Sequence, residues 1–90
     1  MLKRSEKVFE YELPIKIIPQ KEGGFVVTCP VWKDCFAQGE SVDEAVLEIT
    51  AVAQSLIELY KEEGLQIPLK LQSTKRVDNS HLSVPILTTA

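Results

Sequence analysis

The sequence predicts a small α+β domain in the order β-β-β-α-β, with one long helix on one face of a mostly antiparallel sheet. Two patterns carry this prediction. Apolar and polar residues alternate strictly over 9–17, which is typical of a half-buried strand, and apolar residues recur with helical spacing over 42–63. At 90 residues the chain is long enough for one domain, which would bury only about 60–65% of its unfolded surface. Such a marginal core favours a homo-oligomer.

Three short strands are expected before the helix. The first spans 9–17, and Pro14, which has no N–H, places it at a sheet edge or marks a bulge. A polar reversal containing Gly23 and Gly24 leads into a second strand over 25–29, so the two strands form a hairpin. The side chains expected on the inner face of the first strand are Phe9, Tyr11, Leu13, Ile15 and Ile17. Those expected on its outer face are Glu10, Glu12, Pro14 and Lys16.

Pro30 ends the second strand, and 36–38 is expected to return beside it as a third strand. Gly39 then allows a turn that a residue with a Cβ would resist. Ser41 and Glu44 form a capping box, in which the Ser41 hydroxyl accepts from the Glu44 N–H and the Glu44 carboxylate reaches back to the Ser41 N–H. These signals predict a helix that begins at residue 42.

The helix is expected to end at residue 63. Gly64 is placed to adopt a left-handed cap, and Pro68 prevents continuation of the helix. A fourth strand is predicted over 66–71, followed by a polar loop. Residues 82–87 alternate again, which predicts either an edge strand marked by Pro85 or a frayed tail. The expected division is a domain over 1–72 and, over 73–90, a linker with a C-terminal tail or an added strand.

Charge and hydropathy restrict the possible partners. The net charge is −3, with both signs scattered along the chain. No basic stripe is present, so nucleic acid is not expected as a direct partner. An acidic balance favours encounter with a basic protein. The first residues lack an apolar signal region, and no apolar run approaches the length of a membrane span, so we expect no membrane contact and a cytoplasmic protein.

Residue types used in catalysis are few. Cys29 and Cys35 are interpreted as two thiols in a reducing compartment, with a cross-strand disulfide as the alternative. Together with His81 they are too scattered for a structural zinc site. Glu10 and Glu12 share a strand face and could seed a two-metal site, but alternation makes this the solvent face. We therefore expect no catalytic residue, metal or cofactor.

Residues 11–68 nevertheless carry an ordered set of motif residues. In chain order these are Gly23, Gly24, Phe25, Val26, Pro30, Cys35, Gln38, Gly39, Ser41, Glu44, Ala45, Glu62, Gly64, Ile67 and Pro68. The set resembles that of the HicB-like antitoxins. The chain departs from the family pattern at Trp32, which replaces a Leu, and at Asp34, where a Gly usually precedes Cys35; Asp tolerates a left-handed backbone better than most residues. The resemblance implies a partial ribonuclease-H-like fold.

The resemblance also implies a function without catalysis. HicB-like antitoxins bind and occlude a small HicA-type toxin that cleaves messenger RNA. The alternative is a free-standing, homo-oligomeric HicB-like module with a structural or ligand-binding role. Many members continue into a DNA-binding module, but only about twenty residues follow the predicted fourth strand here, too few for a helix-turn-helix or ribbon-helix-helix.

The expected partner-binding residues lie in two segments of the sequence. Trp32, Lys33 and Asp34 follow Pro30 in a loop, where a large aromatic side chain either covers the core edge as a lid or anchors a partner. Glu10 and Glu12 supply a polar strand face as the second candidate.

Overall fold

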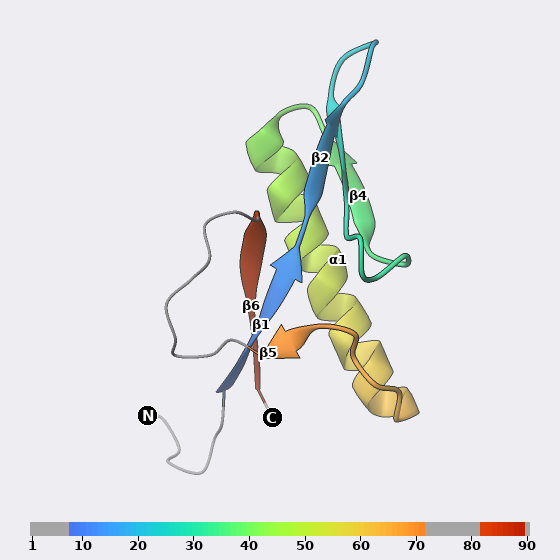
Figure 1. The fold of residues 1–90 in the computed structure, drawn as a ribbon, viewed down its shortest axis with the longest axis vertical. Helices are drawn as coiled ribbons and strands as arrows, with labels where there is room; N and C mark the ends of the chain where they lie inside the picture. Colours follow the sequence, from blue (N-terminus) through green and yellow to red (C-terminus); the bar gives the residue numbers. More distant parts are fainter. Residues whose placement is uncertain (1–7, 72–81, 90) are drawn as a thin grey trace.

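The computed structural model describes residues 8–71 and 82–89 (Figure 1). It confirms the α+β class, with one helix and antiparallel strands. The elements are β1 (Val8–Pro14), β2 (Lys16–Pro19), β3 (Phe25–Thr28), β4 (Phe36–Gly39), α1 (Val42–Glu63), β5 (Lys70–Leu71) and β6 (Ser83–Thr89). The strands form two three-stranded sheets, in the orders β5-β1-β6 and β2-β3-β4.

The two sheets share one run of chain, because β2 follows β1 after the single residue Ile15. The sequence predicts a single strand over 9–17 in which Pro14 marks a sheet edge or a bulge. The structure interrupts this strand one residue after Pro14, and β1 is the central strand of its sheet, so the edge alternative is wrong. The Ile15 N–H donates to the Leu82 carbonyl at 3.1 Å, which extends the pairing of β1 with β6. The alternation itself is confirmed, since Leu13 and Ile15 are buried while Lys16 is exposed.

One face of α1 closes the core over both sheets. Figure 1 shows α1 passing behind β2, with β4 on one side of it and β6 on the other. The helix buries Ala45, Ile49, Ala53 and Ile57, which are spaced one turn apart as expected for an amphipathic helix. The sheets contribute the other buried apolar side chains, among them Leu13, Val27 and Ile86. The hydrophobic core is therefore built mainly from aliphatic residues.

Both helix caps form as predicted, with one difference. Ser41 Oγ accepts from the Glu44 N–H at 3.1 Å, but the Glu44 carboxylate accepts from the Glu40 N–H at 2.7 Å and not from Ser41. The chain enters the helix tightly: a Cβ on Gly39 would lie 2.6 Å from the Ala45 nitrogen. This approach brings the Glu40 N–H over the first turn. At the other end Gly64 is left-handed, with φ 72°.

The predicted fourth strand over 66–71 is wrong in extent, because β5 contains only Lys70 and Leu71. The register of β1 gives the reason. Odd-numbered N–H groups of β1 face β6, so even-numbered ones face β5, and Glu12 pairs with Lys70. The next hydrogen-bonded pair in this register would be Pro14 with Pro68. Neither has an N–H, so the ladder ends.

Of the two alternatives predicted for residues 82–87, an edge strand or a frayed tail, the structure contains the strand. β6 pairs along the full length of β1, from Val8 opposite Thr89 to Pro14 opposite Ser83. Ile86 is fully buried, and Pro85 lies in a strand at the sheet edge, as predicted. His81 and the predicted loop after residue 71 lie outside the described residues, and the proposed domain boundary remains a prediction.

Candidate partner-binding surface

Trp32 is a lid over the core. Its side chain is 3% exposed, and its ring packs edge-on against Tyr60 with centroids 5.0 Å apart and an interplanar angle of 82°. Backbone bonds hold the loop in this form: the Trp32 N–H donates to the Cys29 carbonyl and the Cys35 N–H donates to the Trp32 carbonyl. The structure therefore favours the lid over the anchor, because a buried indole offers no surface to a partner.

The neighbouring loop residues point outward. Lys33 and Asp34 are exposed, and Asp34 Oδ2 accepts from the Tyr60 hydroxyl at 3.4 Å. The tolerance of Asp34 for a left-handed backbone is not needed at this turn. No described residue other than glycine has a positive φ, so the turn forms without that conformation. The loop thus closes against α1 at Tyr60.

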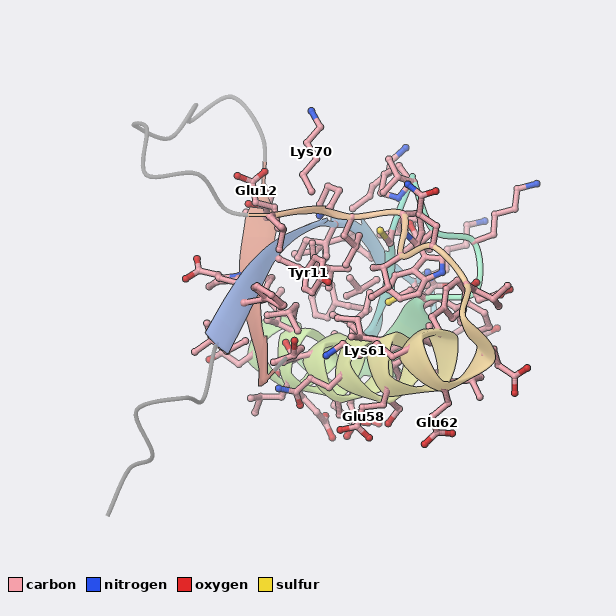
Figure 2. The ribbon with its side chains drawn as sticks, turned by 90° about the horizontal axis from the view of Figure 1, so that it is seen from below. Tyr11, Glu12, Glu58, Lys61, Glu62 and Lys70 are labelled. Carbon is pink, nitrogen blue, oxygen red and sulfur yellow. The ribbon has the colours of Figure 1, made fainter. Side chains whose placement is uncertain are left out.

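Glu10 and Glu12 lie on the outer face of β1, away from α1, and are half-buried. Glu12 stands opposite Lys70 on one side and Pro85 on the other. Figure 2 shows Glu12 and Lys70 on the side of the sheet opposite to Glu58 and Glu62 of the helix. Because Asp34 contacts the helix, the structure does not bring the predicted strand and loop residues together into one surface.

The exposed side of α1 is a stronger candidate, although it is not among the partner-binding segments predicted from the sequence. Six of the 13 acidic residues of the chain lie in this helix, against one basic residue, Lys61. All six are exposed: Asp43, Glu44, Glu48, Glu58, Glu62 and Glu63. The signal is present in the sequence as a local charge bias over 42–63, which helical periodicity alone assigns to a solvent face.

Two features distinguish this side of α1 from an ordinary solvated helix surface. Glu44 and Glu48, like Glu58 and Glu62, stand four residues apart, a spacing at which like charges repel by a few tenths of a kcal/mol. Leu47 lies on the same side and is 70% exposed. An exposed apolar side chain next to charged side chains is an arrangement found in protein interfaces. The acidic helix face is defined here as Glu44, Leu47, Glu48, Ala51, Glu58 and Glu62.

Other parts of the molecule are weaker candidates for a binding site than the acidic helix face. A hollow of about 280 Å³ lies between the β2–β3 turn and the start of α1, lined in part by Gln38, Glu40 and Glu44. Its Glu44 carboxylate is already used as a cap. Within residues 8–71 and 82–89, no three His, Cys, Asp or Glu side chains gather closely enough to hold a metal ion. Nor does this part of the chain contain a helix long and apolar enough to cross a membrane.

Cys29 and Cys35 are both buried and both free, so the structure contains thiols and not the alternative disulfide. Burial raises the pKa of Cys35 from 9.0 to about 11, and the neighbouring Cys29 thiol adds to this rise. Burial also raises the pKa of Cys29, partly offset by backbone hydrogen bonds from Val31 and Trp32. Both groups stay protonated at neutral pH, which makes them weak nucleophiles.

The raised pKa of Cys35 predicts a loss of stability in alkali. Between its ordinary pKa of 9.0 and its folded value of about 11, the unfolded chain releases the thiol proton while the folded chain keeps it. The free energy of unfolding is therefore unaffected by this group below pH 9. It decreases as the pH rises above 9, by up to about 1.4 kcal/mol per pH unit. Urea unfolding from about pH 8 to pH 11 should show a shallower decline in Cys35→Ala than in the unsubstituted protein. Parallel declines would contradict this assignment, whatever the absolute stability of the variant.

The fold and this surface define a class: a small α+β domain that presents one acidic helix. The chain belongs to the UPF0150 family. It is 36% identical over 55 residues to the UPF0150 protein ssl0259 of Synechocystis sp., a match that spans 61% of this chain and 75% of the relative. It is 29% identical over 58 residues to the UPF0150 protein ssr1765 of the same organism, spanning 64% and 73%. No family model matches the chain, and no solved structure matches it.

Proposed function

We propose that this protein is a HicB-like antitoxin-type protein that binds a small, basic HicA-type toxin and occludes it. The observation that carries the proposal is the acidic helix face, on which Glu44 and Glu48 flank the exposed Leu47 and Glu58 and Glu62 continue the negative charge toward the end of the helix. A toxin that cleaves messenger RNA needs a positive surface to hold phosphates. A negative helix of a partner competes for that surface directly.

The electrostatics favour fast association. Carboxylates of one sign along α1 produce a field that steers a cationic partner toward the helix and raises the association rate. Binding also relieves the mutual repulsion of Glu44 with Glu48 and of Glu58 with Glu62, since a cation between two carboxylates interacts favourably with both. The affinity of such a complex decreases as salt increases.

Leu47 supplies an apolar contact, which the charged residues of the helix do not. Rim charges mainly affect association rates, whereas a buried apolar contact near the centre of an interface slows dissociation. Leu47 lies one turn from Glu44 on one side and from Ala51 on the other, so its 70% exposed side chain is available to fill a pocket. The HicB-like motif residues support the same role, because Gly39, Ser41 and Gly64 have structural functions that shape the ends of this helix.

A binding measurement on the neighbouring gene product tests this proposal. If a short adjacent reading frame encodes a basic protein, it should form a complex with this chain at low salt. The triple variant Glu48→Gln, Glu58→Gln, Glu62→Gln should slow association about tenfold or more. The matched control is Glu10→Gln with Glu12→Gln on the opposite sheet face, which should change association little.

The outcomes test the antitoxin role and the acidic helix face as its contact surface separately. If the adjacent basic protein does not bind, the antitoxin role is wrong. If it binds and the triple variant associates as fast as the control variant, the role stands and the acidic helix face is not the contact. The rival assignment, a free-standing homo-oligomeric HicB-like module, predicts no complex with any toxin.

A further inference from the structure

The free edges of the two sheets are not equivalent, and the difference is set by proline. An edge strand exposes unpaired N–H and C=O groups, which are blocked when a proline nitrogen stands in their place. In β6 the residues that bond β1 are even-numbered, because Leu82 accepts from Ile15. The nitrogen of Pro85 therefore faces the free side. That edge lacks a donor at its centre.

The edges of β2 and β5 are also blocked. The Gln20 N–H donates to the Gly24 carbonyl at 3.0 Å, so even-numbered groups of β2 face β3 and the nitrogen of Pro19 faces the free side. The strand β5 has only two residues and follows Pro68. Three of the four edges formed by the described strands thus carry a proline or are too short to pair.

The edge of β4 has no such protection. The Cys29 N–H donates to the Cys35 carbonyl, so odd-numbered residues of β4 bond β3, and the N–H groups of Phe36 and Gln38 face outward. Neither of these two N–H groups donates to a backbone carbonyl of the described residues, because the pairing with β3 uses only the odd-numbered residues of β4. The strand contains no proline and no charge, and the Phe36 side chain is 60% exposed beside this edge.

We infer that β4 pairs antiparallel with β4 of a second copy of this chain. A two-fold axis at Ala37 places Phe36 of one copy opposite Gln38 of the other. In this register both outward N–H groups of each copy meet carbonyls, and the two Phe36 rings become diagonal neighbours within reach of each other. The pairing joins the two β2-β3-β4 sheets and keeps both α1 helices on one side.

Charge argues for a second copy over a basic protein at this edge. The outer face of β2-β3-β4 carries one charged residue, Lys16, beside Ile18, Val26, Thr28, Phe36 and Gln38. No carboxylate on this outer face attracts a cationic partner, and its one charged residue lies on β2, at the edge of the sheet away from the proposed contact. Because the edge is only four residues long, the interface is smaller than that of a permanent dimer, and association should be weak and concentration-dependent. It does not depend on the proposed toxin.

Sedimentation velocity over a wide concentration range tests the inference. The unsubstituted protein should pass from monomer to dimer between about 10 μM and about 500 μM. Gln38→Pro removes an outward N–H and no internal bond, and Phe36→Lys adds a charge at the edge; each should weaken dimerisation at least about tenfold. The matched control is Ile18→Lys on the same outer face at β2, which should dimerise normally.

Amide exchange gives an independent readout. Exchange of the Phe36 and Gln38 amides should slow as concentration rises, while that of Ala37, already bonded to β3, should not change. A protein that stays monomeric at about 500 μM would overturn the inference. So would a dimer that survives Phe36→Lys, or one that Ile18→Lys disrupts equally, since the contact would then be elsewhere on the sheet. Phe36→Lys decides the matter if Gln38→Pro does not fold.

Discussion

Replacing Trp32 by alanine is expected to lower the free energy of unfolding by about 3–5 kcal/mol, the range for truncation of a fully buried aromatic residue. The side chain is 3% exposed and packs edge-on against Tyr60, so its removal leaves a cavity between the loop and α1. A loss this large approaches the whole stability of a small domain. Urea unfolding followed by circular dichroism at low temperature is the appropriate measurement.

Trp32→Phe is the matched control. The indole Nε1–H of Trp32 is buried without a hydrogen-bond partner, and such a donor costs about 1–3 kcal/mol. Phenylalanine keeps much of the apolar contact and removes this cost, so the variant should lose less than half as much stability as Trp32→Ala. If Trp32→Ala left the unfolding midpoint unchanged, the lid assignment would be wrong and the side chain would again be a candidate partner anchor.

Gly39→Ala should be the most damaging of the glycine substitutions. A Cβ at this position would lie 2.6 Å from the Ala45 nitrogen, 2.9 Å from its Cα and 3.0 Å from the Glu44 carbonyl carbon. All three are backbone atoms of the first helical turn, so relief requires moving β4 or α1. Overpacking of this kind costs about 1–3 kcal/mol and occasionally more. Thermal unfolding of the variant measures the loss.

Gly64→Ala separates this steric effect from backbone strain. Gly64 has φ 72°, yet a Cβ at this position would have no neighbouring atom within 4 Å, so alanine meets only the left-handed penalty of about 1 kcal/mol. Gly39→Ala should therefore cost more than Gly64→Ala. Equal losses would mean that β4 and the helix start separate without cost, and that their close approach does not restrict the fold.

Short-range signals made most of the fold predictable. The cap at Ser41, the left-handed Gly64 and the glycine-containing turn before β3 depend on residues only a few positions apart. All three were predicted correctly, except that the Glu44 carboxylate accepts from the Glu40 N–H and not from that of Ser41. The length of β5 was not, because it depends on which residue of β1 faces Pro68. That register is set by long-range pairing, which no local pattern contains.

The candidate site was harder to predict for the same reason. A tryptophan in a loop is buried or exposed according to what packs on it, and here that residue is Tyr60, far along the chain. The strand residues Glu10 and Glu12 were correctly placed on the outer face, but the sequence did not show that the loop at Asp34 closes against Tyr60 of α1. Only the charge bias of α1 could have been recognised from sequence alone.

The pairing of β1 with β6 has a consequence for how the chain folds during synthesis. Val8 stands opposite Thr89, so β1, which is synthesised first among the described elements, cannot form this pairing until β6, the last of them, has been synthesised. Until β6 leaves the ribosome, Ile86 is absent from the core and the side of β1 that β6 covers is unpaired. Closing such a long loop is slow relative to local hairpin and helix formation. The nascent chain should therefore pass through a stage in which the β2-β3-β4 sheet has formed and β1 is still exposed. During this stage a chaperone or a second nascent chain has access to β1.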